Sequence, residues 1–307
     1  MLRVSFYEPG TPVEPWLEGL RAHLPGALVD RWVQGAPPAD YAVLWAPPQQ
    51  LIDQQTRLKA IFNIGAGVDR LLELRLPRKV KVVRLEDAGM AVQMAEYVCH
   101  ALIRHFREFE AYEGQAHNRQ WIPRAARGRV DYPVGIMGLG VLGERVAQAV
   151  RQFEFPLLGW SRTLRQMDGV RCFAGPAGLN DFLAATRVLV CLLPLTKDTR
   201  NIVCHGNLSQ LQAGAYVINV ARGGLVVEED LLALVNSGHL AGATLDVFQT
   251  EPMQPGHPFW RHPKIQVTPH ISAQTLRDAS IAQIAGKIIA LESGQPIAGI
   301  VDLERGY

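Results

Sequence analysis

Three side chains in the second half of the chain have types that suit proton transfer beside a bound anion. His270 lies in "VTPHISAQT", Glu251 in "LDVFQTEPMQ" and Arg222 in "INVARGG". An imidazole can donate a proton near neutral pH, and a carboxylate bonded to its other nitrogen favours the imidazolium form. A guanidinium can hold a carboxylate and a neighbouring oxygen through parallel hydrogen bonds. Together the three could bind a small anionic substrate and protonate it.

Each of these residues also has an ordinary explanation. His270 could be a hydrogen-bonded core residue, and an arginine after a strand is more often a surface residue. The chemical interpretation requires that the fold bring the three together. Each residue follows a successive apolar run, and the loops after parallel strands meet at one edge of a sheet. We therefore expect the three to converge there.

A glycine motif indicates what this chemistry would act with. Gly138, Gly140 and Gly143 lie in "VGIMGLGVLGERVAQAV", between a strand-like run and a helix-like run. Such a turn lets backbone N–H groups approach a pyrophosphate at the positive end of a helix. The motif predicts a dinucleotide site, and hydride transfer to or from a nicotinamide; a purely structural turn is the alternative.

The residues after the next predicted strand bear on the choice of dinucleotide. NAD sites place Asp or Glu there, but this chain has "SRTLR" at 161–165. Ser161, Arg162 and Arg165 suit a 2′-phosphate because guanidinium groups bind phosphate oxygens in pairs. We predict NADPH, with NADH as the weaker alternative and surface arginines without a ligand as the other interpretation.

The elements that would position these residues alternate along the chain. The strand-like runs are apolar almost throughout, which is typical of parallel strands covered on both faces, so we predict an α/β fold with two Rossmann-like domains. Residues 89–120 have helical spacing over about 25 residues, and 275–291 form a second such stretch. The arginine-rich "WIPRAARGRV" predicts a solvated loop or a subunit contact. The predicted strands are LRVSFY, YAVLW, KAIFN, KVVRL, YPVGIM, FPLLGW, RVLVCL, AYVINV, ATLDVF and KIQVT.

The composition restricts the kinds of partner. The 307 residues include 31 Lys and Arg against 29 Asp and Glu, a formal charge of +2 that does not favour nucleic acid or an anionic membrane. We expect small-molecule partners. The four cysteines have no metal-site spacing, so no metal is predicted. Because no signal peptide or membrane span is evident, we predict a cytoplasmic protein.

Seven blocks in a fixed order carry a resemblance to a known family. They are "NIGAGVDRL", "MAEYV", "GIMGLGVLG", "LPLTKDTRNI", "INVARGGLVVEEDLL", "LDVFQTEP" and "VTPHISAQT". Through them the chain resembles the D-isomer-specific 2-hydroxyacid dehydrogenase family over essentially its whole length. Within that family, "EDAGMAVQMAEY", "GWSRT" and "TPHISAQT" are most similar to the NADPH-dependent glyoxylate/hydroxypyruvate reductase A group.

The resemblance implies roles for individual positions. Arg222 would bind the substrate, Glu251 would be the partner acid and His270 the proton donor. The backbone at Ala66 and Gly67 would receive the substrate carboxylate, and Trp45 would wall the substrate pocket, although simple packing is an open alternative for Trp45. The implied cofactor contacts are Gly138, Gly140, Leu142, Gly143, Ser161, Arg162, Arg165, Leu193, Pro194, Thr199, Ala221 and Asp246.

The resemblance also implies an architecture and an activity. A dinucleotide-binding domain, residues 100–271, would be inserted into a flavodoxin-like substrate domain, residues 1–99 and 272–307. A homodimer would form through the cofactor domain and its projecting loop, about residues 113–129. The implied activity is NADPH-dependent reduction of a small 2-oxo acid of the glyoxylate or hydroxypyruvate type. The alternatives are an NAD-dependent dehydrogenase that works towards oxidation, and a cofactor-sensing protein like the corepressors of this fold.

Overall fold

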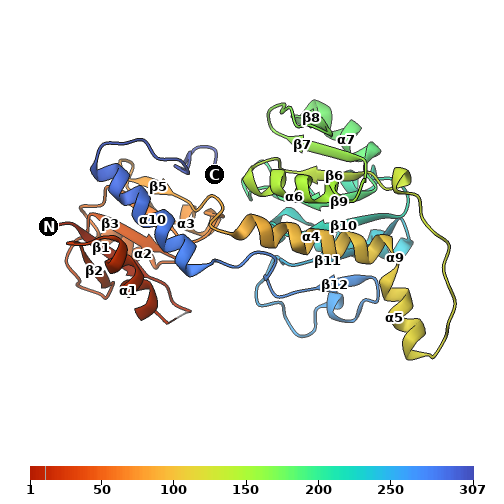
Figure 1. The fold of residues 1–307 in the computed structure, drawn as a ribbon, viewed down its shortest axis with the longest axis horizontal. Helices are drawn as coiled ribbons and strands as arrows, with labels where there is room; N and C mark the ends of the chain where they lie inside the picture. The colour runs from red at the N-terminus through yellow and green to blue at the C-terminus, as the bar shows by residue number, and fades with distance from the viewer. Residues whose placement is uncertain (11) are drawn as a thin grey trace. The chain divides into compact units, whose positions relative to one another are not determined.

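The chain forms two compact units, each built on one parallel sheet. The structure is a computed structural model that describes residues 1–10 and 12–307. One unit comprises residues 1–90 and 275–307, and the other comprises residues 91–274 (Figure 1). The predicted α/β class with two parallel sheets is confirmed. The predicted domain ranges, with substrate binding by residues 1–99 and 272–307 and dinucleotide binding by residues 100–271, stay predictions.

The smaller unit contains a five-stranded sheet in the order β2-β1-β3-β4-β5, with every neighbouring pair parallel. This is the order of flavodoxin-like folds. Its last helix comes from the C-terminal part of the chain, so the other unit is an insertion in sequence. The elements are β1 (Arg3–Tyr7), α1 (Glu14–His23), β2 (Leu28–Arg31), β3 (Tyr41–Leu44), α2 (Gln49–Gln54), β4 (Ala60–Asn63), α3 (Asp69–Leu72), β5 (Lys81–Val83) and α10 (Arg277–Glu292).

The larger unit contains a seven-stranded sheet in the order β12-β11-β10-β9-β6-β7-β8, again with parallel pairs throughout. Six of these strands follow the order of dinucleotide-binding sheets, and β12 extends one edge. The elements are α4 (Met90–Phe106), α5 (Phe109–His117), β6 (Val134–Met137), α6 (Val141–Arg151), β7 (Leu157–Ser161), β8 (Val170–Ala174), α7 (Leu179–Ala185), β9 (Val188–Cys191), α8 (His205–Leu208), β10 (Ala215–Asn219), α9 (Glu228–Ser237), β11 (Leu240–Leu245) and β12 (Ile265–Val267).

The continuous apolar runs become strands that are buried on both faces. Successive side chains of a strand point to opposite faces, so Val188 and Val190 of β9 enter one hydrophobic cluster while Leu189 and Cys191 enter the other. Helices cover both faces, as a parallel sheet requires. The two clusters hold the sheet rigid beneath its carboxyl edge.

Two strands and one helix boundary differ from the sequence prediction. Each predicted strand overlaps an observed one, but β2 and β8 were not predicted. Both are edge strands with exposed or half-exposed positions, so neither has a continuous apolar run. Among the described residues, no helix is both long and apolar enough to cross a membrane.

The prediction of a continuous helical stretch of about 25 residues within 89–120 was wrong, because the helix breaks at Glu108. Glu108 has a left-handed φ of 53°, a conformation that costs a non-glycine residue roughly 1–2 kcal/mol. Its carboxylate accepts charge-assisted bonds from Arg124 and Arg127, each at 2.7 Å, which offset this cost. As a result α5 leaves the direction of α4, and Figure 1 shows it extending away from the sheet.

Candidate active site

Arg222, Glu251 and His270 follow three strands that are neighbours in the larger sheet. Arg222 comes three residues after β10, Glu251 follows β11 and His270 follows β12. The three strands are parallel and adjacent, so all three residues leave the sheet at its carboxyl edge. The expected convergence on one edge is therefore present.

Glu251 and His270 form a direct hydrogen-bonded pair. His270 Nδ1 lies 2.8 Å from Glu251 Oε2, and the other carboxylate oxygen accepts a bond of 3.0 Å from the backbone N–H of Phe248. The side chains are 42% and 24% exposed, respectively. Because Nδ1 is engaged, Nε2 is the ring nitrogen left to act on a substrate.

The buried residue Asp246 fixes the backbone at His270 and at the two residues that follow it. Asp246 is fully buried, and its Oδ1 and Oδ2 accept bonds of 2.8 Å from the N–H groups of Ile271 and Ser272. The N–H of His270 bonds the Asp246 carbonyl at 2.9 Å. These bonds hold His270 at a left-handed φ of 56°. The predicted contact of Asp246 with a cofactor stays a prediction.

Arg222 stands on a turn that is tied to the buried end of β10. Asn219 is fully buried; its side-chain amide donates to the Arg222 carbonyl at 3.0 Å and accepts from the Ala221 N–H at 3.2 Å. Arg222 Nη1 donates to the Ala221 carbonyl at 2.7 Å. The guanidinium is thus presented at the sheet edge by a fixed backbone.

The glycine turn between β6 and α6 has the geometry of a phosphate cradle. Gly138 has a φ of 106°, and a Cβ at Gly143 would lie 1.9 Å from the Gly138 carbonyl oxygen, so neither position accepts a side chain. Gly140 begins α6 without a side-chain cap, and a Cβ there would meet no described atom within 4 Å. The backbone at the positive end of this helix therefore has room for a bound group. This arrangement fits a dinucleotide pyrophosphate.

The residues after β7 are basic and accessible. Ser161 ends β7 and donates to the Thr163 carbonyl at 2.8 Å, while Arg162 and Arg165 are exposed. Arg165 borders a surface hollow of about 500 Å³ that residues 164–168, Val170 and Cys172 line. No acid stands at 161–165, so this position fits a phosphate better than a ribose hydroxyl.

The remaining predicted cofactor contacts lie in turns of the same unit. Thr199 closes the turn after β9, accepting from the Thr196 N–H at 2.8 Å and donating to the Pro194 carbonyl at 2.6 Å. The cofactor-binding roles predicted for these residues stay predictions. Leu193 and Ala221 are buried, and Leu142 is half-buried in the first turn of α6.

The predicted substrate contacts Trp45, Ala66 and Gly67 lie in the smaller unit. The Asn63 side-chain amide donates to the carbonyls of Gly65 and Gly67, each at 2.9 Å, and so fixes the "GAG" turn. The Trp45 ring covers Gly65, where a Cβ would come within 2.6 Å of a ring atom. Packing therefore explains the position of Trp45, and the substrate roles of these residues stay predictions.

Sequence reasoning missed Thr268. Its hydroxyl donates to Asp246 Oδ1 at 2.6 Å and so completes the set of donors around the buried carboxylate. A threonine two residues before a histidine does not indicate, from sequence alone, a hydrogen bond to a distant aspartate. Only the pairing of β11 with β12 brings it to Asp246.

The fold and this edge define a class, namely two-unit α/β proteins with a dinucleotide-binding sheet whose carboxyl edge carries an acid-supported histidine. A profile described as "D-isomer specific 2-hydroxyacid dehydrogenase, NAD binding domain" matches residues 99–272. Glyoxylate/hydroxypyruvate reductase A from Yersinia enterocolitica is 43% identical, and that from Serratia proteamaculans is 45% identical; both alignments cover all of both chains. The chain belongs to the D-isomer specific 2-hydroxyacid dehydrogenase family, and the predicted membership is confirmed.

Solved structures agree with this assignment. A family member from Xanthobacter autotrophicus Py2 in complex with NADPH and MES has a TM-score of 0.95 at 37% identity, covering 99% of each chain. The NADPH-dependent glyoxylate/hydroxypyruvate reductase from Sinorhizobium meliloti, in complex with NADP and sulfate, has a TM-score of 0.93 at 35% identity and covers 100% of each chain. Both of these neighbours therefore hold the 2′-phosphorylated cofactor.

Proposed function

We propose that this chain reduces a small 2-oxo acid, such as glyoxylate or hydroxypyruvate, to the 2-hydroxy acid with NADPH. The hydrogen bond of 2.8 Å between His270 and Glu251 at the carboxyl edge of the larger sheet carries this proposal. The names of the full-length relatives support the substrate class. Catalysis by Arg222, Glu251 and His270 is part of the proposal.

Each catalytic residue has a separate task in the proposed reaction. When bound, NADPH supplies the hydride that reduces the carbonyl carbon. Arg222 binds the substrate carboxylate and polarises the carbonyl oxygen. His270 gives its Nε2 proton to that oxygen as negative charge develops, and Glu251 stabilises the imidazolium before the transfer and fixes the ring plane. The alcohol forms, and His270 regains a proton from water.

The choice of NADPH rests on the basic segment after β7. Arg162 and Arg165 stand where an NAD site has an acid, and the Xanthobacter and Sinorhizobium structures contain NADPH or NADP. We expect Arg162→Ala to raise the KM for NADPH about tenfold or more while leaving the KM for NADH nearly unchanged, because one charge-assisted phosphate contact is lost. Arg171→Ala, an exposed arginine on β8, is the control. Equal effects on both cofactors would remove Arg162 from phosphate binding.

The direct test is a panel of small 2-oxo acids assayed by NADPH and NADH oxidation. We expect turnover of glyoxylate and hydroxypyruvate, with NADPH preferred. Tight NADPH binding without turnover of any acid would favour the cofactor-sensing alternative. Faster oxidation of 2-hydroxy acids with NAD would favour the dehydrogenase alternative.

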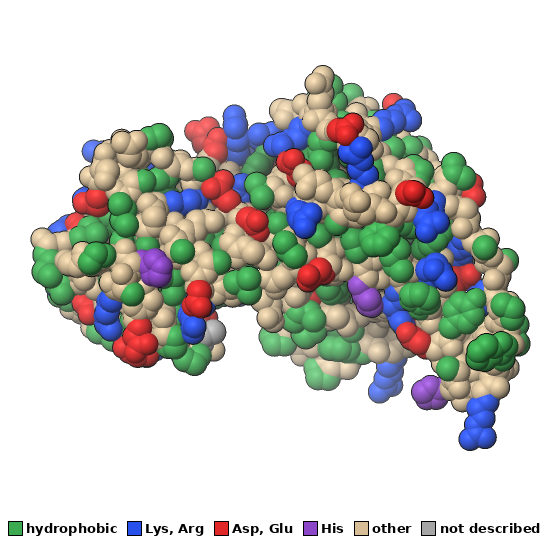
Figure 2. All heavy atoms as spheres, viewed as in Figure 1, with side chains coloured by type: hydrophobic (Ala, Val, Ile, Leu, Met, Phe, Trp, Pro, Cys, Tyr) green, Lys and Arg blue, Asp and Glu red, His purple; other side chains and the backbone are tan. Residues whose placement is uncertain are grey.

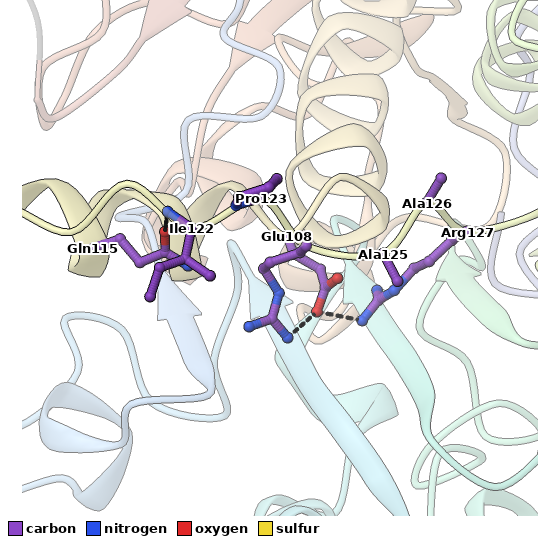
Figure 3. Close-up of a pocket in the computed structure, with 8 residues that line it drawn as sticks. Glu108, Gln115, Ile122, Pro123, Ala125, Ala126 and Arg127 are labelled. Atoms are coloured by element: carbon purple, nitrogen blue, oxygen red, sulfur yellow. Dashed lines mark hydrogen bonds and ion pairs between the residues drawn. The ribbon is translucent and has the colours of Figure 1, made fainter.

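We also propose that the chain forms a homodimer through residues 113–129. This segment exposes Trp121 almost completely and Ile122 by more than half, and Figure 2 shows hydrophobic side chains beside basic ones around α5. Glu108 binds two arginines, Arg124 and Arg127, which together with Ile122 and Pro123 line a hollow of about 480 Å³. Figure 3 shows the Glu108 carboxylate directed towards the guanidinium of Arg127. Such an ordered apolar surface suits a second copy. Sedimentation of Trp121→Asp should give a monomer where the unaltered chain gives a dimer.

We further propose that the protein acts in the cytoplasm, because a reductase of this kind depends on a pool of NADPH that metabolism keeps reduced. Fractionation of cells that produce the chain tests this location. Recovery with the membrane or outside the cell would contradict it.

A further inference from the structure

Helix α4 contacts both ends of the segment that carries His270. We call residues 268–274 the His270 segment. At one end the Tyr97 hydroxyl lies 2.5 Å from Thr268 Oγ1. At the other end the Gln93 side chain donates to the Gln274 carbonyl at 3.0 Å and accepts from the Gln274 N–H at 3.1 Å. Residues four apart share one face of a helix, so a single face of α4 reaches both ends.

The direction of the hydrogen bonds at Thr268 follows from the donors available. The Thr268 hydroxyl has one proton, and it donates this proton to Asp246 Oδ1. Tyr97 must therefore be the donor to Thr268. Burial is the main reason that the pKa of the Tyr97 hydroxyl is raised to about 12, so it keeps its proton at any ordinary assay pH. A directed chain thus runs from Tyr97 through Thr268 to the carboxylate beneath His270.

The His270 segment needs external support because its backbone is strained. A non-glycine residue at a left-handed φ persists only where its surroundings hold it there. Asp246 binds the N–H groups of Ile271 and Ser272 from below, and α4 fixes Thr268 and Gln274 at the two ends. The imidazole is thereby kept on Glu251.

We propose that Tyr97 and Gln93 are positioning residues for His270, through which α4 sets the orientation of the imidazole. Tyr97 and Gln93 bond to Thr268 and Gln274, at the ends of the His270 segment. The catalytic consequence of this inference rests on the proposed function, whereas its structural consequence does not. The two consequences can therefore be measured separately.

Tyr97→Phe removes one hydroxyl and keeps the ring. In single-turnover reduction of glyoxylate by the NADPH-loaded full chain, we expect the rate to fall about tenfold with the Kd for NADPH unchanged, because a small misplacement of the acid is costly. Gln93→Leu should act in the same direction. Thr268→Ser keeps the hydroxyl chain and should retain the rate. In a Thr268→Val background, Tyr97→Phe should add little, because both substitutions break the same chain.

Tyr216→Phe is the matched control. Its hydroxyl also pairs with a threonine of this sheet, Thr244, at 2.8 Å, but it makes no contact with the His270 segment that the structure records. We expect Tyr216→Phe to keep the rate of the unaltered chain. A rate loss equal to that of Tyr97→Phe would overturn the proposal, and so would an unchanged rate in both Tyr97→Phe and Gln93→Leu.

Amide hydrogen exchange separates this proposal from the proposed function. Without any substrate, exchange at Ile271 and Ser272 should rise about tenfold in Tyr97→Phe and Gln93→Leu and stay unchanged in Tyr216→Phe. If the unaltered chain reduced no 2-oxo acid, the proposed function would fail. The exchange data would still test whether Tyr97 and Gln93 position the His270 segment. Unchanged exchange in Tyr97→Phe and Gln93→Leu would refute the positioning role even in an active reductase.

Discussion

Two histidines of the larger unit occupy opposite environments. His270 stands at the carboxyl edge of the sheet, partly exposed and bonded to a carboxylate. His105 lies near the end of α4, stacked on the Tyr216 ring with centroids 4.0 Å apart. Burial, followed by the nearby charges of Arg127 and Arg187, lowers the pKa of His105 to about 4. The same type of side chain is thus hydrogen-bonded to a carboxylate at a partly exposed edge in one region and kept neutral by burial in the other.

The difference shows that the surroundings decide what a histidine can do. An exposed ring beside an acid can lose a proton and regain it from water. A buried ring among guanidinium groups contributes apolar and stacking contacts instead, and charging it costs stability. Changes at each histidine should therefore alter different properties of the protein.

The largest expected effect follows from removing the imidazole at the sheet edge. His270→Ala should lower kcat for glyoxylate reduction by about 10²–10⁴, the usual contribution of a general acid. His105→Phe should leave kcat nearly unchanged. Steady-state kinetics with NADPH test both variants after circular dichroism has shown that they fold. Near-normal turnover in His270→Ala would exclude it as the proton donor.

A smaller effect is expected from neutralising the partner of His270. Glu251→Gln should lower kcat about tenfold, because an amide holds the imidazole at Nδ1 less firmly than a charge-assisted bond to a carboxylate does. The measurement is kcat for glyoxylate reduction by both proteins. An unchanged kcat would show that the acid does not act through the ring.

The smallest effect concerns stability at low pH and should depend on His105. Its folded pKa of about 4 lies below the ordinary value of 6.5, so the unfolded chain binds a proton that the folded chain does not. The contribution of neutral His105 is complete above pH 6.5 and is lost between pH 6.5 and 4, by at most about 1.4 kcal/mol per pH unit. Urea unfolding of His105→Phe should show a shallower loss in this range. His117→Gln, at an exposed histidine, should match the unaltered chain.

Much of the fold could be predicted because parallel strands leave a strong local signal. A run such as "RVLVCL" is apolar at every buried position of β9, and the glycines at 138 and 143 mark a turn that leaves no room for a side chain at either position. The edge strands β2 and β8 lack that signal. The break at Glu108 also escaped prediction, because arginines 16 and 19 residues later in the sequence stabilise it.

The candidate site was predictable in its side chains but not in its supports. The residue types histidine, glutamate and arginine already suggest proton transfer and anion binding. The strand order brings the three residues to one edge of the sheet. Tyr97 lies 171 residues from Thr268, and no local pattern connects them. The role of Asp246 beneath His270 likewise emerges only from the three-dimensional contacts of its two carboxylate oxygens.

The inserted arrangement of the two units constrains the order in which the chain can fold during synthesis. Residues 91–274 are contiguous, so the larger unit can complete its core before the chain is finished. The smaller unit must wait for α10, whose Ile281 packs against Gly19 of α1. Until residue 292 has left the ribosome, the first five strands lack part of their cover, and nascent chains are most exposed to aggregation in that interval.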